Sequence, residues 1–503
     1  MTSKTNNLIP TLLRRSCLFL LLFICMGTLA YGASEHYLKV GLSYNYNEYT
    51  TVKISCSSGL SIGEINANGW NVTSSFLEIK TVTVLVSNGI VQVKKEDGTV
   101  LVESLSTNQG VFPIEKGEVI YANSDGYRGG YCFFPVDQNR MNLINYVELE
   151  DYVRGVVHSE IGQRSPLETL KAQAVCARSY AISNMGKHKA AGYDVCATTD
   201  CQVYKGYKNE YLSTNQACTE TQGQVIKYKG KTVSAYYSKN DGGHTDNVED
   251  IWGTKVGYLR GVRDEFSPLF KWEKTYTFQE LAELLNKAGH SIGNISSVTI
   301  TQRNSSGTAS KLAIWDERKQ TIVPVNSSKI IPGLTIIPGL KNIPGLRNIL
   351  GMNTIKSGMF SFSPIGPKDL EDALENSTSV IKNFGTVTVI NLNQQRTYSK
   401  TLQIIGRDLL IRDAEAGTLA ISNGKLTVLP KEQTDTPSET FTPIINLGTE
   451  SQLSSPITFY GLGWGHGLGM AQDSIIAMGK LGYDYKYMLN YFFTDIKIEA
   501  WNN

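Results

Sequence analysis

The spacing of apolar residues changes from a strand pattern to a helix pattern near residue 145, and this change limits the fold class most. Between residues 37 and 130, stretches such as "TVTVLVSNGIVQVKKEDGTVLVES" alternate β-branched residues with others. Asn88-Gly89 and Asp97-Gly98 stand where hairpin turns belong. Apolar residues at helical spacing follow in "NYVELEDYVRGVVHSE". Strands followed by helices indicate an α+β fold, with a strand-rich N-terminal region before a core of mixed sheets and helices.

The first predicted helix ends on a carboxylate. Asn145 with Glu148 three residues on is a capping-box arrangement, and Gly162 follows the helix as a C′ residue would. Glu160 then faces the negative end of the helix macrodipole, among apolar neighbours that would desolvate it. Both effects favour the protonated carboxyl, which a general acid needs at neutral pH. The residues alone leave a second interpretation open, in which Glu160 simply points into water.

A second helix is predicted directly after this break. Ser165 is its expected N-cap, with Pro166 at N1 and Glu168 at N3. Lys171 and Arg178, seven residues apart, share one flank of the helix. Its packed stripe consists of small or apolar residues that permit close approach to a neighbour: Leu170, Ala174, Ala177 and Ala181.

The N-terminus has the layout of an export signal. Basic residues precede the apolar stretch "CLFLLLFICMGTLA", and small residues follow near Ala33. If this segment stays uncleaved, it anchors the chain to a membrane; in either case the remainder is expected to work outside the cytoplasm. A net charge of +2 gives no indication of a nucleic-acid partner. The six cysteines beyond residue 33 are too sparse for a disulfide scaffold.

Two stretches have the character of insertions. "IIPGLTIIPGLKNIPGLRNILGM" repeats Ile-Pro-Gly-Leu, and proline and glycine at this density predict an extended, turn-rich segment without a helix. Residues 363–455 carry further strand signals and end in a linker rich in Thr, Ser and Pro.

A glycine-rich block near the C-terminus is the next candidate for chemistry. In "GLGWGHGLGM" glycine occupies every second position from 461 to 469, which matches neither a P-loop nor a dinucleotide fingerprint. Alternating glycine lets a backbone lie flat against a bulky ligand, with Trp464 and His466 projecting between. A structural role for this histidine stays equally open.

Three potential zinc ligands lie close together in the sequence. Cys196 and Cys201 flank "ATTD", and His188 lies eight residues upstream. A Cys-x4-Cys pair with a nearby histidine can supply three ligands of a zinc site. A disulfide between the two cysteines, or two free thiols, fits the spacing as well.

Four blocks together resemble one family. They are "YVRGVVHSEI…LKAQAVCARSYA", "CQVYKGY", "YYSKNDGGHTDNVEDIWG…YLRGV" and "GLGWGHGLGMAQ…MLNYFFTDIKI". In this order they resemble the stage II sporulation protein D (SpoIID) family, also called the amidase-enhancer family. The resemblance implies a lytic transglycosylase that acts on bacterial peptidoglycan strands already stripped of their stem peptides. No cofactor is implied for this chemistry.

The resemblance also implies roles for individual residues. Glu160 matches the family's catalytic glutamate, which would protonate the bond oxygen between N-acetylmuramic acid and N-acetylglucosamine and then deprotonate the muramoyl C6 hydroxyl. Lys171 and Arg178 match basic positions that would tune Glu160 or hold the lactyl carboxylate of the substrate. A structural zinc bound by His188, Cys196 and Cys201 is implied by some family members. The implied glycan contacts are Gln202, Tyr204, Tyr237, Ser238, His244, Trp464 and His466.

The family further implies a cell-wall amidase as partner and septal wall remodelling during sporulation. Two alternatives remain. One is a non-catalytic glycan-binding module that stimulates an amidase, and the other is a hydrolytic muramidase, which generally needs a second carboxylate. The expected organisation is a signal or anchor (1–33), a strand-rich region (34–130), the first part of the catalytic core (131–325), a Pro/Gly-rich insertion (326–350), a core segment (351–362), an accessory insertion and linker (363–455) and the C-terminal core block (456–503).

Overall fold

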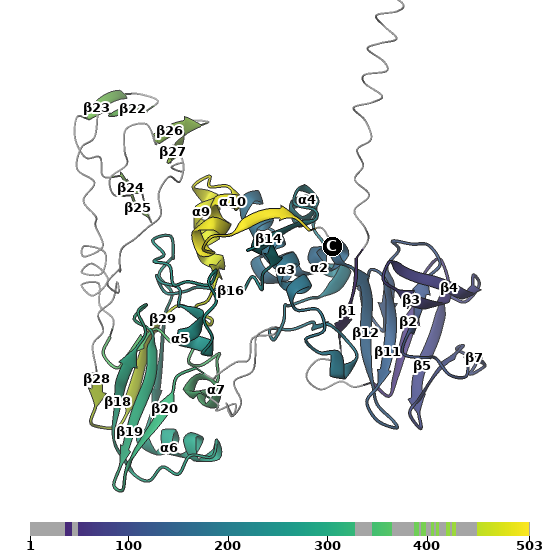
Figure 1. The fold of residues 1–503 in the computed structure, drawn as a ribbon, viewed down its shortest axis with the longest axis horizontal. Helices are drawn as coiled ribbons and strands as arrows, with labels where there is room; N and C mark the ends of the chain where they lie inside the picture. Colours follow the sequence, from purple (N-terminus) through teal and green to yellow (C-terminus); the bar gives the residue numbers. More distant parts are fainter. Residues whose placement is uncertain are drawn as a thin grey trace, which may run out of the picture.

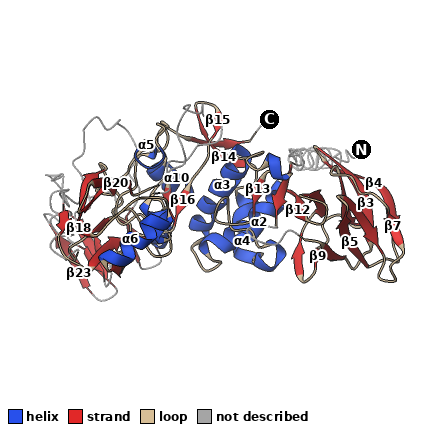
Figure 2. Ribbon diagram, turned by 90° about the horizontal axis from the view of Figure 1, so that it is seen from below, coloured by secondary structure: helices blue, strands red, loops and turns tan. Residues whose placement is uncertain are grey.

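The computed structural model describes residues 36–42, 49–326, 345–364 and 450–501, together with short strands between residues 387 and 428. The expected export signal, most of the Ile-Pro-Gly-Leu insertion and most of the 363–455 segment lie outside this part. In Figures 1 and 2 an N-terminal β lobe, a helical middle and a second β lobe lie in a row. Within the described residues, no helix is both long enough and apolar enough to cross a membrane.

The N-terminal β lobe consists of two sheets that share one apolar core. The first has the order β13-β1-β12-β11-β8-β3-β4, formed by β1 (Tyr37–Gly41), β3 (Leu60–Asn66), β4 (Gly69–Phe76), β8 (Gln109–Pro113), β11 (Gly130–Pro135), β12 (Met141–Glu148) and β13 (Val195–Cys196). The second has the order β10-β9-β2-β5-β6-β7, formed by β2 (Thr51–Ser55), β5 (Thr81–Ser87), β6 (Ile90–Lys94), β7 (Val100–Val102), β9 (Ile120–Ala122) and β10 (Asp125–Tyr127). The predicted turns are confirmed, because Asn88, Gly89 and Gly98 have positive φ between paired strands.

The helical middle combines segments from both ends of the described chain. Its elements are α2 (Leu149–Ile161), α3 (Leu167–Ser183), η1 (Lys189–Ala191), η2 (Gly206–Asn209), α4 (Leu212–Glu220), β14 (Gln224–Tyr228), β15 (Lys231–Thr232), β16 (Tyr237–Ser238), α5 (Val248–Trp252), β30 (Met470–Ala471), α9 (Gln472–Lys480), α10 (Tyr485–Phe492) and β31 (Lys497–Ala500). β14 pairs with β15 and with the C-terminal β31, and β16 pairs in parallel with β30. These two pairings bring the glycine-rich block beside α2 and α3.

The first helix begins three residues later than the capping-box pattern predicted, with Glu148 in place of Asn145 as the N-cap. β12 runs through Glu148, and α2 begins at Leu149 with Glu148 as the N-cap, whose carboxylate accepts the backbone N–H groups of Glu150 and Asp151. Asn145 lies within β12 between β1 and β11, and its side-chain amide donates to backbone carbonyls of β11 and the preceding turn. Pairing on both sides of β12 therefore overrides the local capping signal. The predicted end is confirmed, since Gly162 caps α2 with φ 78°.

The second helix is confirmed, but its cap differs. Pro166 is the N-cap rather than N1, and the Ser165 hydroxyl donates backward to the Ile161 carbonyl at 2.8 Å. Glu168 bonds Lys171 and the Tyr485 backbone N–H instead of closing a capping box. All four residues of the predicted stripe are fully buried: Leu170, Ala174, Ala177 and Ala181.

The second β lobe has a separate apolar core. Its sheets have the orders β17-β29-β21 and β20-β19-β18-β28, formed by β17 (Lys271–Tyr276), β18 (Ile295–Arg303), β19 (Ala309–Asp316), β20 (Gln320–Pro324), β21 (Phe360–Ser361), β28 (Glu450–Gln452) and β29 (Ile457–Leu462), with α6 (Phe278–Lys287) beside them. The short helix α7 (Leu346–Leu350) corrects the prediction that residues 326–350 contain no helix. It begins after Gly345, where the repeat no longer supplies a proline.

Between residues 387 and 428 three further hairpins are described. They are β22 (Val387–Asn391) with β23 (Gln394–Tyr398), β24 (Ile404–Gly406) with β25 (Leu409–Ile411), and β26 (Leu419–Ser422) with β27 (Lys425–Val428). The strand signals expected for the accessory insertion are therefore present.

Candidate active site

Glu160 lies in the last turn of α2, where the chain turns toward α3. The helix ends there because Gly162 adopts a left-handed conformation and donates its N–H to the His158 carbonyl at 2.9 Å. The Glu160 side chain is half-buried. One carboxylate oxygen accepts the backbone N–H of Val203 at 2.7 Å, which holds the side chain against the segment that follows Cys201.

Two further neighbours reach Glu160 from distant parts of the chain. Tyr237 in β16 and Gln472 at the start of α9 both hydrogen-bond its carboxylate. They lie side by side because β16 pairs in parallel with β30, which directly precedes Gln472. The Tyr237 hydroxyl also donates to Gln202 Oε1 at 3.0 Å. Since a hydroxyl has one proton, Tyr237 serves only one of these two acceptors at a time.

The surroundings of Glu160 favour its protonated form. Burial raises the pKa of the Glu160 carboxyl, while the hydrogen bonds from Val203, Tyr237 and Gln472 lower it by a smaller amount. Among the described residues, Glu160 forms no ion pair with a lysine, arginine or histidine, so no positive charge holds it in the ionised form. A carboxyl whose pKa is raised in this way is suited to donate a proton and take one back.

Gln202 and Tyr204 support this site from behind. The Gln202 amide donates to the Tyr152 hydroxyl at 3.1 Å and to the Ala177 carbonyl at 3.2 Å. The Tyr204 hydroxyl donates to Asn145 at 2.8 Å, and its ring packs so closely on Gly155 that any larger residue there would collide with it. Both side chains are buried. In this structure neither side chain offers surface to a ligand, and their direct contact with a glycan stays a prediction.

Lys171 and Arg178 are paired with other acids on the same lobe, and their role as ligands of a substrate carboxylate stays a prediction. Arg178 is fully buried, and its guanidinium donates to both oxygens of Glu150, each at 2.7 Å. Lys171 bonds Glu168 at 2.6 Å and Glu220 at 2.7 Å. Glu150 precedes Glu160 by ten residues of one helix, or about 15 Å along its axis. Arg178 thus acts far from Glu160.

The remaining predicted glycan contacts lie on the glycine-rich block or beside it. Trp464 pairs with Asn240 through two backbone hydrogen bonds of 2.7 and 3.0 Å, and its side chain is exposed. Ser238, in β16, is buried against Gly465. The His466 ring packs against Trp252 and Tyr236, which indicates a structural role. Burial lowers the pKa of His244, whose Nδ1 bonds the Thr245 carbonyl.

A second cluster surrounds the predicted zinc ligands. The structure brings His188 to 3.3 Å from Cys201 Sγ and adds Asp200, which the sequence interpretation missed although it stands between the two cysteines. The donor atoms of His188, Cys196, Asp200 and Cys201 all lie within 4.8 Å of one another. The six described cysteines are free, so the disulfide alternative is not what the structure shows. One imidazole, two sulfurs and one carboxylate fit a tetrahedral zinc ion.

The charges of this cluster are already partly compensated. The Cys196 thiol donates a hydrogen bond to Cys201, and this bond lowers the pKa of Cys201 and raises that of Cys196. Hydrogen bonding to Asp200 raises the pKa of His188 to about 9. The cluster ends two residues before Val203, whose N–H holds Glu160. The cluster and the N–H that holds Glu160 therefore belong to one short segment of the chain.

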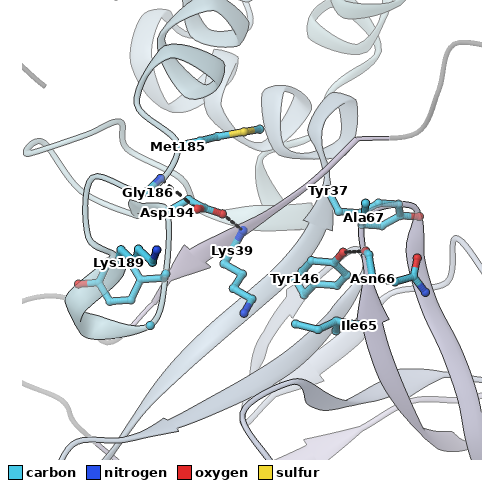
Figure 3. Close-up of a pocket in the computed structure, with 12 residues that line it drawn as sticks. Tyr37, Lys39, Ile65, Asn66, Ala67, Tyr146, Met185, Gly186, Lys189 and Asp194 are labelled. Atoms are coloured by element: carbon cyan, nitrogen blue, oxygen red, sulfur yellow. Dashed lines mark hydrogen bonds between the residues drawn. The ribbon is translucent and has the colours of Figure 1, made fainter. Parts of the chain in front are cut away.

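Two cavities of the described structure lie away from Glu160. The larger, about 650 Å³, lies between β1, the end of β3 and the loop at 185–194, and Figure 3 shows Lys39, Tyr146 and Lys189 around it. The smaller, about 420 Å³, lies at the N-terminal end of α2 beside Trp501. Glu160 lines neither of them.

Comparison with known proteins matches the part of the chain that contains Glu160 to a known family model. The family model described as SpoIID: Stage II sporulation protein matches residues 137–228. An uncharacterized protein of Brachyspira hyodysenteriae is 34% identical over 212 residues, which cover 40% of this chain and 57% of the relative. The amidase enhancer of Bacillus subtilis is 37% identical over 129 residues, covering 26% and 17%. The stage II sporulation protein D of the same organism is 30% identical over 212 residues, covering 39% and 60%. The chain thus spans less than two thirds of the length of each of these relatives.

Proposed function

Because the chain carries a domain of the SpoIID family, we propose that it is a cell-wall remodelling enzyme that cleaves peptidoglycan glycan strands by lytic transglycosylation. Its substrate is the strand after removal of the stem peptides, and Glu160 is its single acid and base. The observation that carries this proposal is a desolvated carboxyl with a raised pKa, held by a backbone N–H at the end of a helix.

The reaction needs one carboxyl group and no water. Glu160 first protonates the glycosidic oxygen, and the bond from C1 of N-acetylmuramic acid to O4 of N-acetylglucosamine breaks. The C6 hydroxyl oxygen of the same muramic acid then bonds C1, and its proton passes to the Glu160 carboxylate. The products are a free 4-hydroxyl end and a 1,6-anhydro end, and Glu160 returns to its protonated state.

The neighbours of Glu160 suit both halves of this cycle. In the first half, burial keeps the carboxyl protonated. In the second half, the N–H of Val203 and the polar groups of Tyr237 and Gln472 stabilise the transient carboxylate without a fixed positive charge. An arginine in their place would hold the carboxylate ionised and remove the acid.

A zinc ion fits this proposal as a structural component. His188, Cys196, Asp200 and Cys201 would hold it. Bound there, the ion would order the loop that leads to Val203 and would take no part in the bond cleavage. Location outside the cytoplasm, through residues 1–33, and cooperation with an amidase that supplies peptide-free strands complete the proposal; a relative is named amidase enhancer.

The test compares the protein with its Glu160→Gln variant on intact and on amidase-treated peptidoglycan, with soluble products analysed by mass spectrometry. We expect anhydromuramoyl ends from treated strands only, and none with the variant. Glu96→Gln is the matched control, because Glu96 is an exposed glutamate of the N-terminal lobe that pairs with Lys53. Products heavier by one water would identify a hydrolytic muramidase. Bound glycan without products from either protein would identify a non-catalytic amidase enhancer.

A further inference from the structure

An unassigned cluster of one lysine and two aromatic rings lies at the glycine-rich block. The Lys356 ammonium lies 5.1 Å from the ring centre of Trp464 and 5.2 Å from that of Phe270. The two rings are 5.8 Å apart and tilted by 40°. The three residues come from separate segments: the chain before β17, the chain between α7 and β21, and the glycine-rich block itself.

Backbone hydrogen bonds hold these three segments together. The Gly463 N–H donates to the Phe270 carbonyl at 2.8 Å, and the Gly465 N–H donates to the Lys356 carbonyl at 2.9 Å. Arg347 donates to that same carbonyl at 2.6 Å. The cluster is therefore positioned before any ligand arrives.

Only glycine permits this close approach. Gly463 and Gly465 have φ of 79° and 133°, and a Cβ on Gly465 would lie 2.5 Å from the Cβ of Ser238. The alternating glycines thus bring Trp464 against the strand that carries Tyr237.

Among the described residues, no carboxylate compensates the charge of Lys356. Within the described residues it forms no salt bridge to a carboxylate, and its contacts are the two ring faces. Two other lysines do form salt bridges: Lys239 pairs with Asp473, and Lys171 pairs with two glutamates. Ring faces attract the ammonium but leave its N–H groups available to an anion. Trp464 is 37% exposed, so it can stack on a ligand as well.

The cluster is also within a short stretch of glycan from Glu160. Tyr237 contacts Glu160, and Asn240, three residues further on, pairs with Trp464. Three residues of extended chain span about 10 Å. A glycan bound at Glu160 can therefore extend along the protein segment 237–240 to Trp464 and Lys356.

We propose that Phe270, Lys356 and Trp464 form a subsite for a carboxylate-bearing sugar of the glycan. The exposed part of the Trp464 ring stacks on the sugar, and the Lys356 ammonium pairs with the carboxylate. This subsite rests on the proposed function and deepens it, because it assigns recognition of the acidic sugar to a residue other than Lys171 and Arg178.

The test measures equilibrium binding in the Glu160→Gln background, where no turnover changes the ligand. The ligands are end-labelled peptide-free glycan strands and the same strands with their carboxyl groups reduced to alcohols. The proteins are E160Q alone, and E160Q combined with K356Q, K356M, K356R or K274Q. Lys274 is the matched control, since it lies over the Tyr276 ring in the same lobe, 5.3 Å from its centre.

We expect E160Q to bind the carboxylated strands about tenfold more tightly than the reduced strands, as a charge-assisted hydrogen bond allows. K356Q and K356M should abolish this preference, and K356R and K274Q should retain it. K356M keeps the apolar stem over the rings, so it gives the comparison even if K356Q fails to fold.

Equal loss of affinity for both strands in K356Q and K356M would overturn the subsite, because it would show a structural role for the lysine. A preference for carboxylated strands that survives in both variants would also overturn it. Failure of the proposed function gives a different result: the unsubstituted protein then yields no anhydro ends, while the binding preference and its dependence on Lys356 remain.

Discussion

Helix α2 carries two desolvated glutamates, one at each end, and their hydrogen-bonding partners differ in charge. Glu150, in the first turn, is bonded by Arg178 through both oxygens and by the Gly223 N–H at 3.1 Å. Glu160, in the last turn, has only neutral donors around it. The helix macrodipole adds to the difference, because it stabilises an anion at the N-terminal end and destabilises one at the C-terminal end.

The comparison separates a structural carboxylate from a reactive one. A buried carboxylate in contact with an arginine holds two elements together, here α2 and α3. A buried carboxyl with neutral partners keeps a proton that it can transfer. The same residue type thus serves packing at one end of α2 and, in our proposal, chemistry at the other.

The largest expected effect comes from removing the proton donor. Glu160→Gln should lower the rate of anhydro-end formation by about 10²- to 10⁴-fold, the usual contribution of a general acid and base. The glutamine carbonyl can still accept the Val203 N–H, so the fold should be retained. Initial rates on peptide-free strands measure the effect, with Glu96→Gln as the control that keeps full activity. Comparable rates for E160Q and the unsubstituted protein would end the assignment of Glu160.

The next largest effect is on the free energy of unfolding, which substitution of Glu150 should lower and substitution of Glu160 should not. Glu150→Gln leaves Arg178 buried without a countercharge and should lower the free energy of unfolding by about 3–5 kcal/mol. Glu160→Gln should leave it equal or higher at pH 7, because the raised pKa makes the Glu160 carboxylate a cost to the folded state. Urea unfolding of both variants at pH 7 measures the difference.

The pH dependence of the free energy of unfolding is the control for this comparison. The cost of Glu160 develops as pH rises from its ordinary pKa of 4.5 through the raised folded value, so E160Q and the unsubstituted protein should converge in stability below pH 4.5. If E150Q proved as stable as E160Q at pH 7, the contrast between the two ends of α2 would fail.

The His188 cluster offers a third way to compensate buried charge, by a metal ion. Zinc at a hundredfold excess over its Kd should stabilise the fold by about 2.7 kcal/mol, and a chelator should reverse this. Cys201→Ser should abolish both the response and the bound zinc, measured by thermal unfolding and elemental analysis. Cys56→Ser removes a cysteine of the N-terminal lobe and should leave both unchanged. Unaltered zinc content in C201S would exclude this cluster as the site.

The smallest expected effect tests how the Tyr237 hydroxyl changes the pKa of Glu160. The Tyr237 hydroxyl lowers the pKa of Glu160, so Tyr237→Phe should raise that pKa further. Because the protonated form is the acid, the fall in rate at alkaline pH should move to higher pH. A pH–rate profile measures the shift. Tyr258→Phe is the control, since Tyr258 is a buried tyrosine whose hydroxyl bonds the Ser234 carbonyl; a shift of equal size in that variant would contradict the mechanism.

Some parts of the site follow from residues close together in the chain. Gly162 ends α2 because only glycine adopts its backbone conformation without strain, so the position of Glu160 at a helix end was predictable. The turn at Asn88-Gly89 was predictable for the same reason. Where a local signal competed with strand pairing, it lost: Asn145 matched a helix cap, but β12 is hydrogen-bonded on both sides at that residue.

Local sequence was therefore sufficient for the C-terminal end of α2, its glycine cap and the turns at Asn88-Gly89 and Gly98, because these depend on the backbone preferences of a few neighbouring residues. Which charges are compensated depended on the fold. Arg178 meets Glu150 28 residues away, and Val203 meets Glu160 43 residues away. No spacing rule shows that Lys171 forms salt bridges and that Lys356 forms none with the residues the structure describes. Electrostatic environment is a sum over contacts in space, and those contacts exist only once β16, β30 and α2 have come together.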